Sequence, residues 1–335
     1  MKILKALAGM AVLFVVSASH GTGQVLPGPN GPVEFIGLQK WDAQELFDAI
    51  QELEPDRPFH ACAAVMKRQL GFADAAAFLY FTDNLDSIDQ SSNRYTVVVG
   101  VEDSTQVLYR TTGNETVVLP EAWQDLLAVA NEDFNVLPLA ASTLHMRYFG
   151  GELAKAMGVD PETLDQVWEL VDRANGEEDF RLAHEVLARD SLWTARAVAT
   201  LLLGNFIDDD TAWHGLVGSA IDTDGRVNTV AQRALDRLAQ QGRHSVDWSA
   251  AHSPLSALFS GTNPFAFEGI LEVLVATDID PEFGQQLVRD RPSLLLAYVG
   301  AEHEGTREPA IAFLKAVSGE DFGADLNAWT AWINQ

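Results

Sequence analysis

Cys62 and His60 are the residues whose types and spacing best suit chemistry in this sequence. Cys62 is the only cysteine among 335 residues, so it cannot form a disulfide within the chain. Near the start of a helix, the helix dipole lowers the pKa of a thiol, and a thiolate beside a base is a nucleophile. Small apolar neighbours equally suit an inert cysteine in the core. We favour the inert interpretation and keep a thiol enzyme, with His60 or His145 as base, as the alternative.

Three adjacent carboxylates, Asp208, Asp209 and Asp210, form the second candidate cluster. They could hold a cation, but they also precede a predicted helix that begins near Thr211, where carboxylates cap a helix and stabilise its first turn. The histidines are dispersed without metal-ligand spacing, and the sequence has no glycine-rich phosphate loop or nucleophile elbow. The sequence therefore predicts no cofactor, with these aspartates as the only candidates for a metal.

The stretch Asp-Thr-Asp-Gly at 222–225 is similar to the start of a calcium-binding loop. The twelfth position of such a loop needs a glutamate, and here it is Arg233. We therefore interpret these residues as an acidic turn between two helices.

A small α+β unit, residues 33–123, must position Cys62. Apolar residues recur at helical spacing over 41–53, and a second helix that opens near Pro58 carries the cysteine. Short runs rich in Val, Tyr, Phe and Leu follow, and we predict strands at 76–81, 95–101, 106–110 and 115–119. These elements predict an antiparallel sheet with helices packed on it.

Two stretches of this unit, HACAAVMKRQLGF and RYTVVVGVEDSTQVLYR, resemble in outline the papain-like cysteine peptidases of the bacteriocin-processing kind. In that family a cysteine at a helix start is followed by a strand pair that bears a histidine. Here Asn93, Arg94 and Tyr95 stand where the histidine is expected. Because a thiolate without its base loses its activation, the resemblance implies a degenerate, inactive version.

Beyond this unit the sequence predicts helices only. Residues 124–179 form a helical connector, and paired amphipathic helices repeat over 180–335. The predicted hairpins are 182–188 with 193–203, 211–221 with 226–238, 248–259 with 265–275, and 283–299 with 306–317. Aligning the second helices superposes Leu202, Leu235, Leu271 and Leu314 at intervals of 33, 36 and 43 residues. This spacing is in the range of helical solenoids.

The second helices also resemble those of HEAT repeats. That family has an acidic turn, then Val-Arg, then Ala and Leu four residues apart, which here are Asp224, Val227, Ala231 and Leu235, with Asn228 in place of the arginine. Arg307, Ala310 and Leu314 hold matching places in the last hairpin. The end of the chain, GEDFGADLNAWTAWINQ, is similar to the end piece of bacterial HEAT-repeat proteins, where paired tryptophans close the stack. The resemblance implies an αα-solenoid that binds proteins or peptides, with a repeat core of Leu202, Ala231, Leu235, Leu271, Ala310, Leu314, Trp329 and Trp332.

The start of the chain has the pattern of a secretory signal peptide over residues 1–18. Lys2 and Lys5 precede a short apolar run, and small residues with a cleavage position after Ala18 follow. Residues 19–32 are rich in Gly and Pro and predict a flexible lead-in. We expect a bacterial protein that is secreted or periplasmic, without membrane insertion after signal removal.

The net charge of the chain limits which kinds of partner it can bind. The formal net charge is −26, which disfavours nucleic acid, and the four lysines beyond the signal form no polybasic patch for a membrane. We therefore expect an α+β unit followed by an all-α, HEAT-like solenoid that acts as a non-catalytic interaction or scaffold protein. Its expected partner is a protein or peptide bound on the helical-repeat surface. A papain-like thiol hydrolase using Cys62 is the alternative.

Overall fold

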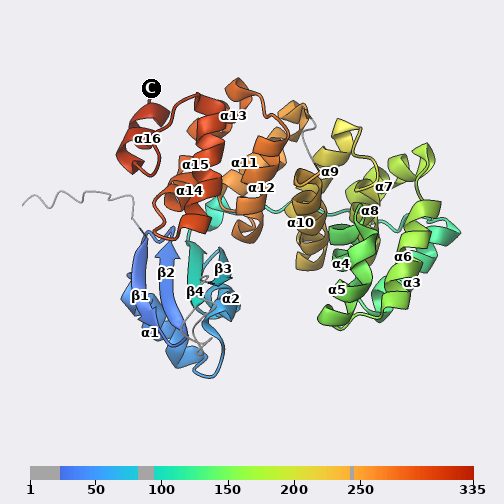
Figure 1. Ribbon diagram of the computed structural model, residues 1–335, viewed down its shortest axis with the longest axis horizontal. Coiled ribbons are helices and arrows are strands. Elements are labelled where there is room, and N and C mark those ends of the chain that lie inside the picture. Colours follow the sequence, from blue (N-terminus) through green and yellow to red (C-terminus); the bar gives the residue numbers. More distant parts are fainter. Residues whose placement is uncertain (1–22, 82–93, 242–244) are drawn as a thin grey trace, which may run out of the picture.

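The computed structural model describes residues 23–81, 94–241 and 245–335. A four-stranded sheet with its helices forms one end of the molecule, and the remaining helices extend from it as an arc (Figure 1). The predicted order of an α+β unit followed by an all-α region is confirmed. The predicted signal peptide, residues 1–18, lies outside the described residues.

The sheet consists of β1 (Gln24–Gly28), β2 (Gly31–Ile36), β3 (Asp74–Phe81) and β4 (Arg94–Val101) in the order β1-β2-β4-β3. It is mixed rather than antiparallel, because β2 and β4 run parallel while the other pairs are antiparallel. β1 lies within the predicted flexible lead-in, so the prediction was wrong there. The Gly- and Pro-rich stretch forms the tight turn between β1 and β2, where Gly31 adopts a φ of 121°.

Both faces of the sheet are buried. One face, with Phe35 and Val98, packs on α1 (Ala43–Leu53), η1 (Phe59–Ala61) and α2 (Ala63–Gln69). The other face, with Val97 and Val99, belongs to the core of the helical region. This burial on both sides explains why Val97, Val98 and Val99 follow one another without a polar residue between them.

The predicted strands at 106–110 and 115–119 were wrong. After η2 (Ser104–Gln106), residues 107–119, here called the strap, run irregularly past the ends of successive helical hairpins. Leu108 N donates to Thr262 Oγ1 at 2.7 Å, and Arg110 N donates to the Ile221 carbonyl at 2.9 Å. Glu115 N then donates to the Arg189 carbonyl at 3.0 Å. The strap thus satisfies its backbone on helix ends instead of a sheet.

The helical region begins with α3 (Glu121–Glu132), α4 (Val136–Thr143), η3 (Arg147–Phe149), α5 (Gly150–Met157) and α6 (Pro161–Arg173). The hairpins that follow, here called the stack, are α7 (Glu177–Arg189) with α8 (Trp193–Leu203), α9 (Asp210–Ala220) with α10 (Gly225–Ala239), η4 (Trp248–Ala251) and α11 (His252–Ser260) with α12 (Pro264–Ala276), and α13 (Pro281–Asp290) and α14 (Pro292–Val299) with α15 (Glu304–Ser318). No helix in the described ranges is long and apolar enough to cross a membrane.

α10 lies at the centre of the helical region and packs on α4, α8, α9 and α12. Its apolar stripe, Val227, Val230, Ala231, Ala234, Leu235 and Leu238, is buried throughout. The aligned second-helix residues Leu202, Leu271, Ala310 and Leu314 are buried too, in one continuous core. At the end of the chain, α16 (Leu326–Ile333) packs on α13 and α14 through the buried Trp329, with Trp332 only partly buried beside it.

The sheet is attached to the far end of the stack through a buried carboxylate. Glu34 on β2 is fully buried and accepts hydrogen bonds from Tyr95 Oη at 3.0 Å and from His303 N at 3.0 Å. Gly23 N also donates to the Gly300 carbonyl at 3.1 Å. These contacts fix the sheet against the turn between α14 and α15.

Candidate functional site: an acidic groove between the sheet and the stack

Cys62 lies in the core of the α+β unit. It is 2% exposed, and burial raises the pKa of its thiol to about 12. Its Sγ contacts Met66 Sδ at 3.9 Å, while the His60 side chain is exposed and has no hydrogen bond to it. His145, the other candidate base, bonds to the Gly204 carbonyl at 3.1 Å. A nucleophilic thiol needs access and a lowered pKa, and Cys62 has neither.

The three aspartates before α9 have structural contacts. Asp209 caps the helix by accepting from Thr211 N at 2.8 Å, and Asp210 Oδ2 accepts from Asp247 N at 2.9 Å. Within the described ranges, Asp208 has no hydrogen bond to Asp209 or Asp210, and the three carboxylates share no hydrogen-bond partner. No group of three or more His, Cys, Asp or Glu side chains in the described ranges is placed to hold a metal ion.

The acidic turn at 222–225 joins the strap to the stack. Asp222 is fully buried and accepts from Arg196 on α8 at 2.9 and 3.0 Å and from Arg110 on the strap. Burial favours the neutral carboxyl, but the two guanidinium groups outweigh it and hold the pKa of Asp222 below its usual value. This turn is therefore a structural ion cluster, and Asp224 caps α10.

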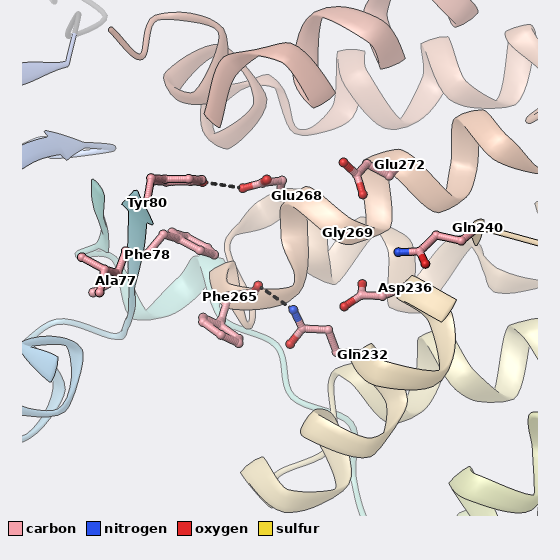
Figure 2. A pocket seen from close by; sticks show the side chains of 11 residues that line it. Ala77, Phe78, Tyr80, Gln232, Asp236, Gln240, Phe265, Glu268, Gly269 and Glu272 are labelled. Atoms are coloured by element: carbon pink, nitrogen blue, oxygen red, sulfur yellow. Dashed lines mark hydrogen bonds between the residues drawn. The ribbon is translucent and has the colours of Figure 1, made fainter. Parts of the chain in front are cut away.

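A cavity of about 390 Å³ lies where β3, α10 and α12 meet. Figure 2 shows Phe78 and Tyr80 from β3 on one side and Gln232 and Asp236 from α10 on the other, with α12 between them. Its lining residues are Ala77, Phe78, Leu79, Tyr80, Gln232, Asp236, Gln240, Phe265, Glu268, Gly269 and Glu272. The cavity is thus shared by the sheet and the stack.

The floor of the cavity is the outward stripe of α12. Phe265, Glu268, Gly269 and Glu272 recur at i, i+3, i+4 and i+7, while Phe267, Ile270, Leu271 and Leu274 point into the core. A Cβ at Gly269 would lie 2.5 Å from Asp236 Oδ1. The glycine therefore lets the Asp236 carboxylate lie close against the floor.

Three carboxylates gather on this floor and its α10 wall. Burial raises the pKa of Glu268 to about 7, and the charges of Glu272 and Asp236 add to the shift. Burial raises the pKa of Asp236 to about 6, although Arg233 opposes it, and burial also raises the pKa of Glu272. Such a cluster favours the binding of a positive charge, because a cation would offset both desolvation and mutual repulsion.

Aromatic side chains form the wall on the β3 side. Phe78 stacks on Phe265 with ring centroids 5.3 Å apart, and Tyr80 Oη donates to Glu268 Oε2 at 2.9 Å. The Tyr80 ring lies 4.0 Å from that of His303, and Thr306 Oγ1 donates to Tyr80 Oη at 3.1 Å. These contacts hold β3 and α12 at a fixed separation.

Two further hollows continue the cavity in both directions. One of about 360 Å³ shares Gln232 and Phe265 with it and extends to Lys67, Asp74 and Tyr109. The other, of about 380 Å³, shares Glu272 and extends over Pro309 between α12 and α15. The three hollows together are here called the groove. It is long and open rather than a closed pocket.

Sequence reasoning did not find this site. Tyr80 and Glu268 are 188 positions apart, and nothing in the spacing of Asp236, Glu268 and Glu272 indicates that they converge. The available signal was the polar stripe on α12, which has an aromatic residue and a glycine within it.

No family model matches the chain, and the searches of curated proteins and of solved structures gave no match either.

Proposed function

We propose that this protein is a non-catalytic binding protein whose groove takes a segment of a protein or peptide. The observation that carries the proposal is the groove itself, with hollows of about 360, 390 and 380 Å³ adjoining one another across β3, α10, α12 and α15. Small-molecule sites are mostly enclosed and apolar, whereas an elongated, open surface suits a chain.

The arrangement of the stack supports the same proposal. Its second helices, α8, α10, α12 and α15, pack on one another in chain order, as nearest-neighbour repeats do. With the HEAT-like pattern in the sequence, this supports an αα-solenoid of the HEAT type, a class that binds partners along extended surfaces. The burial of Cys62 supports a degenerate, inactive form of the papain-like resemblance.

We also propose that the protein works outside the cytoplasm, because residues 1–18 have the pattern of a signal peptide. N-terminal sequencing of the protein isolated from its native cells tests this. A mature chain beginning near Ser19 supports export, and a chain that retains Met1 contradicts it.

Photo-crosslinking from a single engineered cysteine tests the binding proposal. Because Cys62 is buried, a benzophenone maleimide should label Gln240→Cys at the groove selectively. Glu169→Cys on the exposed side of α6 is the matched control. We expect synthetic random decapeptides to crosslink to the groove position several-fold more than to the control. Equal yields from both positions would contradict the proposal.

A further inference from the structure

We propose that the occupant of the groove is an extended segment bearing Lys or Arg at alternate positions, which adds to the outer edge of β3 as a further strand. Its cationic side chains would lie on the carboxylates of Asp236, Glu268 and Glu272. This inference rests on the proposed function and specifies the partner's chemistry and its mode of binding.

β3 is an edge strand that opens on the groove. In the sheet order β1-β2-β4-β3 it pairs only with β4 among the described strands. Successive side chains of a strand point to opposite faces. Four consecutive residues, Ala77 to Tyr80, nevertheless line the cavity, so its wall is the backbone edge of the strand rather than one face.

An edge strand presents unpaired N–H and C=O groups, which an extended peptide can pair with. A new strand would lie about 4.8 Å beyond β3. At that place α12 supplies the floor, and Gly269 lets the Asp236 carboxylate of α10 lie close against it. Alternate side chains of the added strand would therefore face α12, and the others would point to the opposite face of the sheet.

The floor selects for a positive charge on the side chains that face it. Glu268 receives its hydrogen bond from a neutral group, Tyr80 Oη. Among the described residues, Asp236 has an ion pair with Arg233, whose guanidinium is 3.9 Å away and half exposed. An ammonium or guanidinium group placed between these carboxylates would make charge-assisted hydrogen bonds with them. With a formal net charge of −26, the chain as a whole also attracts basic segments over acidic ones.

Defined peptides test the inference. The probe is a fluorescein-labelled octapeptide of alternating Lys and Val, and its controls are the alternating Glu and Val peptide and two N-methylated forms. One form carries N-methyl groups on every Lys amide and the other on every Val amide. Binding to the whole protein is measured by fluorescence anisotropy.

Adding as a strand uses only one alternate set of peptide N–H groups. We therefore expect one N-methylated peptide to lose binding and the other to keep it. Asp236→Asn and Glu268→Gln should each weaken binding of the Lys peptide roughly tenfold. Glu169→Gln removes the same charge from α6 and should leave the affinity unchanged. Circular dichroism checks that the variants are folded.

Two outcomes overturn the inference and separate it from the proposed function. If both N-methylated peptides bind like the parent, the addition of a strand to β3 is wrong. If the carboxylate variants bind like Glu169→Gln, the recognition of Lys or Arg by these carboxylates is wrong. Crosslinking from Gln240→Cys would in that case still support a bound peptide. If neither the octapeptide nor the random peptides crosslink preferentially there, both proposals fail.

Discussion

At the scale of single residues, the groove contains carboxyl groups in an unfavourable setting. Glu268 is half-buried, and its neighbours Asp236 and Glu272 carry the same charge. A neutral side chain at this place would make the folded state more stable, because burial penalises the ionised form. Residues that cost stability in the free protein are commonly found where a ligand binds.

The variant Glu268→Gln should therefore stabilise the protein at pH 8 and have little effect at pH 5. The raised pKa, about 7 against about 4.3 in the unfolded chain, means that the native state binds more protons between these values. Stability consequently falls as pH rises from about 4 to about 7, and glutamine escapes this loss. Glutamine also keeps an oxygen that accepts from Tyr80.

Thermal unfolding followed by circular dichroism at pH 5 and pH 8 measures this effect. The melting temperature of Glu268→Gln should exceed that of the wild type at the higher pH only. Glu169→Gln, on the exposed side of α6, serves as the control and should shift neither value. A gain in melting temperature of equal size at both pH values would show that the effect of Glu268→Gln does not come from removing an ionisable group.

At the scale of elements, the strap joins parts that are far apart in sequence. It contacts the α11–α12 turn at Thr262, the α9–α10 turn at Ile221 and the end of α7 at Arg189. Each contact holds one hairpin in its place relative to the next. The strap therefore restrains the hairpins beyond their nearest-neighbour packing.

We expect Gly113→Ala to destabilise the protein by about 1–3 kcal/mol, as overpacking does. An added Cβ would lie 1.9 Å from the Arg189 carbonyl oxygen, so the strap would have to move away from α7. Gly218→Ala is the opposite case, since a Cβ there, inside α9, meets nothing within 4 Å. It should stabilise by about 0.5–1 kcal/mol through helix propensity.

Urea unfolding of the two glycine variants gives both free energies. If Gly113→Ala were neutral or stabilising, the strap would not be tightly packed on α7. If Gly218→Ala destabilised the protein as much as Gly113→Ala, the loss of stability would follow from adding a methyl group anywhere. It would then not be evidence for the close approach of Gly113 to the Arg189 carbonyl.

The elements differ in how far the sequence predicts them. The α10 stripe was predicted correctly because helical periodicity depends only on local spacing. The strap was mistaken for two strands because runs such as Gln106–Arg110 have the composition of strands, which does not reveal what lies beside them. The groove depends on the meeting of β3 with α12, a contact between distant residues that no local pattern encodes.

At the scale of the whole molecule, α16 covers the end of the stack. Trp329 is fully buried, donates from Nε1 to the Gly323 carbonyl at 2.8 Å and packs edge-on against Trp332 at 6.1 Å. Without α16 the last helices of the stack would expose their apolar side. We therefore expect that removing the cover exposes the apolar sides of α13 and α14.

Trp329→Ala should lower stability by about 3–5 kcal/mol, as loss of a buried tryptophan does, and should promote self-association. Trp332→Ala, which removes a partly exposed ring from the same helix, should have a smaller effect. Urea unfolding and light scattering measure the two consequences. Equal effects of both variants would contradict the role assigned to Trp329.

The direction of the strap has a consequence for the order in which the chain is made. The strap passes the hairpins in the reverse of their order in the sequence. Leu108, near its start, can form its hydrogen bond only after Thr262 has been synthesised, whereas Glu115, near its end, needs only Arg189. Glu34 can accept its hydrogen bond from His303 N only after His303 has been synthesised, which is later still. Contacts this distant form slowly because the loop between them must close first. We therefore expect one face of the sheet to stay uncovered until almost the whole chain is available for folding, and to be prone to aggregation during that time.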